Sequence, residues 1–74
     1  MRGYAVELRV RWDDGRRHSC IVELQAEDSD HAIELAVERA QREFPEGSVE
    51  VSDRPYRYRG APRRPRLIRP RKVV

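Results

Sequence analysis

Arginine and tyrosine alternate in the segment that follows residue 53. Tyr56 and Tyr58 stand among Arg54, Arg57 and Arg59. An arginine side chain is a planar fork that matches phosphate oxygens and stays charged at any working pH. A tyrosine ring offers a surface on which a base of single-stranded nucleic acid can stack. This spacing predicts contact with nucleic acid.

The basic character continues to the C-terminus. From residue 54 onward the chain has nine of its 16 basic residues and no acidic one, so residues 1–53 keep seven basic residues and all 13 acidic ones. The net charge of +3 is therefore the sum of two opposite charges. Residues 1–53 form an acidic body, and residues 54–74 form a basic Arg/Pro/Tyr-rich arm. The candidate nucleic-acid-binding residues all lie in the arm: Arg54, Tyr56, Arg57, Tyr58, Arg59, Arg63, Arg64, Arg66, Arg69, Arg71 and Lys72.

A second interpretation of the arm needs no nucleic acid. The arm could instead wrap the body and neutralise its carboxylates. Its nine charges exceed the six-charge deficit of the body, and exposed ion pairs are weak, so nucleic acid is favoured. RNA or a ribonucleoprotein surface is favoured over DNA, because tyrosines alternate with arginines and no recognition-helix pattern is present. The apolar pairs Leu67-Ile68 and Val73-Val74 can distinguish these two interpretations of the arm, since packing of these residues would make the arm structural.

Few residues could carry catalysis or bind a metal. His18 and Cys20 are two residues apart, His31 follows, and no other His or Cys exists. A zinc site takes three or four ligands, and a cysteine nucleophile needs a base and an oxyanion site. We predict a core cysteine and a histidine at the hairpin edge. With 74 residues, too few to enclose a deep pocket, the chain is predicted to be no enzyme and to bind no metal or cofactor.

Two segments with strict apolar–polar alternation predict a β-hairpin. They are residues 4–12 and 16–26, and Asp13-Asp14-Gly15 lies between them. A three-residue turn with the glycine in the left-handed region pairs Val10 with His18 and puts apolar residues opposite each other along both strands. With a two-residue turn, each cross-strand pair of the hairpin would combine an apolar residue with a polar one. We therefore predict the three-residue turn.

A helix is predicted after this hairpin. Ser29 or Asp28 can cap it, and Pro45 and Gly47 end it. Its predicted apolar stripe is Ile33, Ala36, Val37, Ala40 and Phe44, with Leu35 on the flank. Residues 48–52 then resume strand alternation, with Val49 and Val51 expected to point inward.

These elements predict a small α+β domain with ββαβ order. One helix packs on a three-stranded sheet, and a right-handed crossover gives the strand order 2-1-3. Beyond Asp53 the pattern loosens. Tyr56 and Tyr58 could prolong the third strand past an irregularity at Pro55, and residues 66–69 could dock as a short edge strand.

The predicted function is that of a small, non-enzymatic accessory protein that binds nucleic acid through the arm. The alternative is a protein-interaction module, such as a regulator, inhibitor or assembly component, including one encoded by a phage, whose tail packs on its own fold or on a protein partner. A homodimer is a further alternative. The acidic surface of the helix could dock a basic protein, and its residues are Asp28, Asp30, Glu34, Glu38 and Glu43.

Cellular location is inferred from what the chain lacks. No apolar run reaches membrane-spanning length, and residues 1–4 do not resemble a signal peptide. A single cysteine cannot form an internal disulfide. We expect a cytoplasmic protein without membrane contact.

Overall fold

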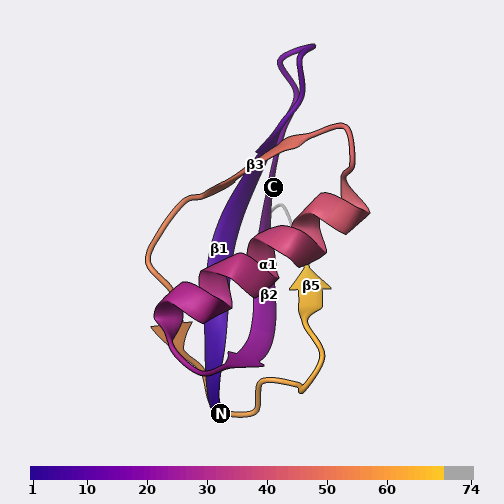
Figure 1. Cartoon of the computed structure of the whole chain (residues 1–74). Coiled ribbons are helices and arrows are strands. Elements are labelled where there is room, and N and C mark those ends of the chain that lie inside the picture. The colour runs from indigo at the N-terminus through magenta and orange to yellow at the C-terminus, as the bar shows by residue number, and fades with distance from the viewer. Residues whose placement is uncertain (70–74) are drawn as a thin grey trace.

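One helix lies across one face of a five-stranded antiparallel sheet (Figure 1). The computed structural model describes residues 1–69. In chain order the elements are β1 (Arg2–Arg11), β2 (Arg17–Ala26), α1 (Ser29–Glu43), β3 (Ser48–Val51), β4 (Tyr56–Arg57) and β5 (Arg66–Ile68). The predicted α+β class is confirmed.

The β1–β2 hairpin has the predicted register. Its strands pair from Arg2 opposite Ala26 to Arg11 opposite Arg17. In the turn, the Trp12 N–H donates to the Arg16 carbonyl at 3.0 Å, and Gly15 has a φ of 88°. The alternation therefore buries one face of both strands: Tyr4, Val6, Leu8 and Val10 from β1, and Cys20, Val22, Leu24 and Ala26 from β2.

The N-terminus of α1 is capped by Asp28, one of the two predicted candidates. The Asp28 carboxylate accepts a hydrogen bond from the His31 N–H at 2.8 Å. This bond satisfies one of the free amide groups of the first turn, and the negative charge suits the positive end of the helix dipole. The His31 Nδ1 in turn accepts from the Glu27 N–H at 3.1 Å, so the entry into α1 is held by two side-chain bonds.

The buried stripe of α1 largely matches the predicted one: Ala36, Val37, Ala40, Phe44 and Leu35 pack in or against the core, whereas Ile33 does not and Ala32 does. Its centre is Ala32, Ala36 and Ala40, all with no exposed surface, whereas Ile33 and Val37 are half-buried on the flank. Alanine side chains let the helix approach the sheet closely, because interaxial distance follows the side chains at the contact. The bulkier partly buried residues then fill the two sides of this contact: Trp12, Leu35, Val37, Phe44 and Val49.

The sheet is larger than the predicted one. Its order is β3-β1-β2-β5, and β4 also pairs with β1. The neighbours 2-1-3 therefore occur, but the prediction of three strands is wrong, because the segment after residue 53 adds two strands. Strands of two and three residues are too short to show alternation in a sequence.

Strands β3 and β4 follow each other along the same edge of β1. Val51 lies opposite Leu8, and Arg57 lies opposite Tyr4. Val49 packs against the core as predicted, but Val51 is 36% exposed because it ends an edge strand. The chain thus continues past Pro55 along β1.

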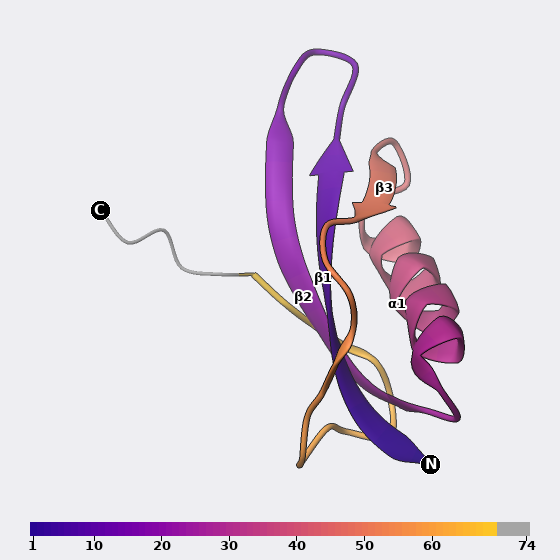
Figure 2. The same ribbon diagram turned by 90° about the vertical axis from the view of Figure 1, so that its left-hand side faces the viewer.

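Residues 54–69, here called the strap, pass from one edge of the hairpin to the other (Figures 1 and 2). After β4 the chain turns at Gly60, whose φ is 86°, and Ala61 is buried. Gly3 permits this crossing, because a Cβ there would lie 2.1 Å from the Tyr58 carbonyl oxygen. Strand β5 then pairs with β2.

The apolar pairs of the C-terminal segment behave differently. Leu67 packs against the core, whereas Ile68 is 36% exposed opposite Ile21. Residues 73 and 74 lie outside the described residues. Residues 66–69 are therefore structural, which favours the second interpretation for this part of the arm. No helix within residues 1–69 is long and apolar enough to cross a membrane.

Removing β5 should destabilise the fold. We expect a chain of residues 1–64 to lose about 2–4 kcal/mol of unfolding free energy, because burial of one Leu contributes about 1.5–3 kcal/mol and the pairing with β2 adds to it. Urea denaturation followed by circular dichroism measures this difference. A chain of residues 1–69, which keeps β5, is the control and should unfold like the full chain. Equal stability of all three chains would mean that β5 does not belong to the fold.

Candidate nucleic-acid interface

The arginines of the strap separate into two groups, of which the first is ion-paired. The Arg66 Nε and Nη2 donate to Glu23 Oε1 at 3.1 and 2.5 Å, and Glu23 is only 8% exposed. This hydrogen bond, helped by the carboxylate charge, raises the pKa of Arg66. The Arg69 Nη2 donates to Glu43 Oε1 at 3.1 Å, and its guanidinium lies over the Phe44 ring. These two arginines hold the strap on the body.

The second group has no carboxylate partner within residues 1–69. Its members are exposed and lie in a stretch that contains no acidic residue: Arg54, Arg57, Arg59, Arg63 and Arg64. Arg57 points to the helix side of the sheet and lies over the Tyr4 ring, 5.7 Å from its centroid. The structure thus presents five guanidinium groups along residues 54–64.

This stretch is fixed on the body at several points. Strand β4 pairs with β1, and the Tyr58 N–H donates to the Gly3 carbonyl at 3.0 Å. The Gln25 side chain donates to the Ala61 carbonyl at 2.9 Å. Because the backbone is held by these bonds, the arginines project from a folded segment rather than from a free arm.

Tyr56 and Tyr58 are two of the five exposed large apolar residues in the described chain. They are 48% and 37% exposed. Tyr56 lies opposite Ala5, whose side chain points away from α1, so Tyr56 is on the open face of the sheet. Alternation puts Tyr58 on the same face. Two exposed aromatic side chains of the strap therefore lie on the open face of the sheet.

On the open face of the sheet, toward the hairpin turn, the charge of Glu50 offsets part of the charge of two arginines. Arg9 and Arg11 form ion pairs with Glu50 at 3.9 and 3.3 Å. Glu50 lies opposite Arg9 in the β1–β3 pairing, so these charges pair across neighbouring strands. These arginines are thus less available than those of residues 54–64.

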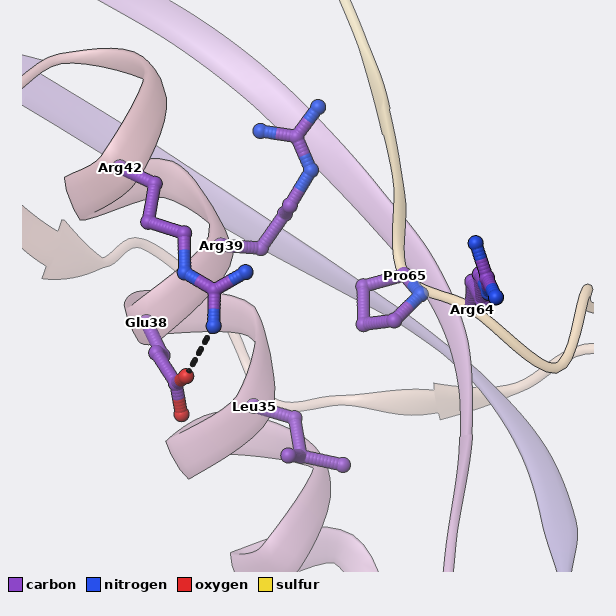
Figure 3. Close-up of a pocket in the computed structure, with 6 residues that line it drawn as sticks. All are labelled: Leu35, Glu38, Arg39, Arg42, Arg64 and Pro65. Carbon is purple, nitrogen blue, oxygen red and sulfur yellow. Dashed lines mark hydrogen bonds and ion pairs between the residues drawn. The ribbon is translucent and has the colours of Figure 1, made fainter.

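A groove that the sequence did not predict lies between α1 and the strap (Figure 3). Its volume is about 450 Å³, and its walls are Leu35, Glu38, Arg39, Arg42, Arg64 and Pro65. Arg42 donates to Glu38 at 2.8 Å, and Arg39 donates to Glu43 at 3.4 Å. Arg39 and Arg42 were not predicted as part of a site, because the acidic residues of the helix surface suggested a basic partner; their spacing of three residues nevertheless puts both arginines on one side of a helix.

The acidic helix surface is only partly occupied by these pairs. Asp30 and Glu34 have no ion pair within residues 1–69. Glu34 and Glu38 border a shallow hollow of about 600 Å³ whose floor includes Ile33 and Val37. This hollow is largely apolar, and Gln41 and Arg42 complete its lining.

Cys20 and His18 lie in the core region and show no catalytic arrangement. Cys20 is 1% exposed, and burial raises the pKa of its thiol, against a smaller opposing effect of Arg69. The His18 ring packs against Phe44, and its Nε2 is buried without a hydrogen-bond partner. Among residues 1–69, no three His, Cys, Asp or Glu side chains converge as a metal site would require. The absence of enzymatic activity stays a prediction.

Two candidate residues, Arg71 and Lys72, lie outside the described residues. No protein-family model, curated protein or solved structure matches the chain. The function is therefore argued from the chain's own geometry and charge.

Burial of Cys20 should make stability depend on alkaline pH. An unfolded thiol ionises near pH 8.5, whereas the folded thiol, whose pKa is raised, keeps its proton to higher pH. The unfolding free energy should therefore fall as pH rises above about 8. Urea denaturation at pH 7 and pH 9.5 should show a larger loss for the natural chain than for a Cys20→Ala variant, which lacks the titrating group. Equal losses in the two proteins would contradict burial of the thiol.

Proposed function

We propose that this chain is a small, non-enzymatic protein that binds single-stranded nucleic acid on the strap, with RNA or a ribonucleoprotein surface ahead of DNA. One observation carries the proposal: the carboxylates of the body take up Arg66 and Arg69 but leave the arginines of residues 54–64 exposed, in the stretch of chain that also contains two exposed tyrosines. Cations and aromatic rings in alternation are the parts of a sequence-tolerant single-strand site.

Each group has a role in this proposal. The arginines bind phosphate oxygens through their planar forks, and the tyrosines stack on bases. Because the strap is already ordered by β4 and the bonds to Gly3 and Gln25, binding would cost less conformational entropy than binding by a free arm. The proposed contact residues are Arg54, Tyr56, Arg57, Tyr58, Arg59, Arg63 and Arg64, followed by Arg71 and Lys72.

Arg66 and Arg69 have a different role from the one that sequence analysis gave them. Their guanidinium groups are engaged by Glu23 and Glu43. We propose that they contribute to binding by holding the strap in place. We also propose a cytoplasmic location, where Cys20 stays a buried thiol.

A protein-interaction module is the second candidate. The hollow over Ile33 and Val37, bordered by Glu34 and Glu38, favours a basic protein segment or a second copy of this chain as the partner. The packing of Leu67 on the core adds to this candidate, because it gives the end of the arm a structural purpose. The binding experiment below separates the two candidates, since a protein-binding module does not need the arginines of residues 54–64.

Charge removal on the strap should weaken RNA binding. We expect Arg59→Gln/Arg63→Gln to lower the affinity for a 12-nucleotide single-stranded RNA about tenfold or more at low salt. The slope of log affinity against log salt should fall by about 1.4, which is roughly 0.7 for each lost phosphate contact. Fluorescence anisotropy over a salt series measures both quantities.

The matched control for this experiment is Arg16→Gln/Arg17→Gln. It removes the same charge at the hairpin tip, away from the strap (Figure 1). Its affinity and salt slope should change less than those of the strap variant. Equal effects of the two variants, or no binding by the natural chain, would refute the proposal and leave the protein-interaction module.

Loss of the tyrosine rings should weaken binding without changing its salt dependence. Stacking on an aromatic ring contributes about 1–3 kcal/mol per base. We expect Tyr56→Leu/Tyr58→Leu to reduce the affinity at least fivefold with an unchanged salt slope. Tyr56→Phe/Tyr58→Phe, which keeps both rings, should bind like the natural chain. An equal loss in both variants would mean that the hydroxyl groups, and not stacking, matter.

A further inference from the structure

We propose that the groove between α1 and the strap binds a phosphate group of the same nucleic acid, so that the binding surface continues from the strap onto the helix. This inference rests on the proposed function and extends it to two residues, Arg39 and Arg42, that carry no role in it. The ligand chemistry is a phosphodiester group flanked by an apolar surface.

The groove is lined by arginines from two parts of the chain. Arg39 and Arg42 come from α1, and Arg64 comes from the strap (Figure 3). Leu35 and Pro65 provide the apolar part of the wall. The volume of about 450 Å³ falls within the range of roughly 300–1,000 Å³ that small-ligand sites occupy.

Charge in and around the groove is positive after its ion pairs are counted. Glu38 accepts from Arg42, whereas Glu43 accepts from both Arg39 and Arg69. Arg64 has no carboxylate partner within residues 1–69. The lining itself contains three arginines and one carboxylate, which leaves two positive charges in excess among the lining residues.

The existing ion pairs do not block a phosphate. A guanidinium group has five N–H donors, and Arg42 uses one of them on Glu38. The Arg42–Glu38 pair is exposed and spans i to i+4, a type that contributes only a few tenths of a kcal/mol. A phosphate can therefore share these guanidinium groups or displace the carboxylates at little cost.

The strap connects the groove to the tyrosines. Its chain leads from Tyr58 through Arg59 and Arg63 to Arg64, which lines the groove. Arg64 follows Arg59 by five residue steps, so their Cα atoms are at most about 18 Å apart. Small single-strand-binding folds cover about 4–16 nucleotides, so one strand of moderate length can reach both places.

The test compares two RNA lengths. A four-nucleotide oligouridine is short enough to occupy the tyrosines alone, whereas a 12-nucleotide oligouridine can also reach the groove. For Arg39→Gln/Arg42→Gln we expect about tenfold weaker binding of the 12-mer at low salt and a salt slope lower by about 1.4. Binding of the four-mer should be unchanged. Fluorescence anisotropy with labelled oligonucleotides gives all four values.

Two controls make the result specific. Arg16→Gln/Arg17→Gln removes the same charge elsewhere, and Arg39→Lys/Arg42→Lys keeps the charge but loses the planar fork, so it should bind the 12-mer with intermediate affinity. The lysine variant also serves if the glutamine variant fails to fold. Unchanged 12-mer binding by the helix variants, or an equal loss in the hairpin-tip variant, overturns the phosphate site. If the strap variants alone weaken binding, the proposed function stands without the groove; if the natural chain binds neither RNA, the proposed function itself fails.

Discussion

The register of the β1–β2 hairpin is the constraint on which the other parts of this fold depend. Gly15 allows the three-residue turn, and that turn puts the apolar residues of both long strands on one face. If one strand slipped by one residue, all of its apolar side chains would move to the opposite face of the sheet. The alanines of α1 then have a smooth apolar surface to pack on, and the open face is left to charged and aromatic residues.

A hairpin of this length leaves two open edges, and the chain after α1 covers both. Strands β3 and β4 lie on β1, and β5 lies on β2. Glu23 is the one charged residue that is buried among residues 1–69, and Arg66 of β5 pairs with it. A buried carboxylate would be costly without a partner, so this pair fixes where β5 docks. The division of the arginines into anchoring and exposed groups follows from this docking.

Part of the fold could be read from the sequence because its signals are local and long. Ten-residue alternation together with Asp-Asp-Gly determined the hairpin register, and Asp28 was one of two caps considered. Strands β4 and β5 were only suggested, because two or three residues show no period. The helix stripe was wrong at one position, because Ile33 is more hydrophobic than Ala32, the alanine that is actually buried.

The candidate site was predictable in composition but not in detail. Counting charges located the basic segment, and the spacing of Tyr56 and Tyr58 indicated stacking. Which arginines are taken up by carboxylates depends on pairs far apart in sequence, such as Glu23 with Arg66 and Glu43 with Arg69. The groove at Arg39 likewise exists only because the strap passes beside α1.

The central claim is that the strap is at once part of the folded sheet and the surface that binds nucleic acid. Nuclear magnetic resonance of the labelled chain, titrated with a 12-nucleotide single-stranded RNA, tests both halves together. We expect the resonances of Tyr56, Tyr58, Arg59 and Arg63 to shift on binding, while the methyl resonances of Leu67 keep the positions of a packed side chain. Shifts confined to the hairpin tip, or Leu67 methyl resonances that move to the positions of an unpacked leucine when RNA binds, would contradict it.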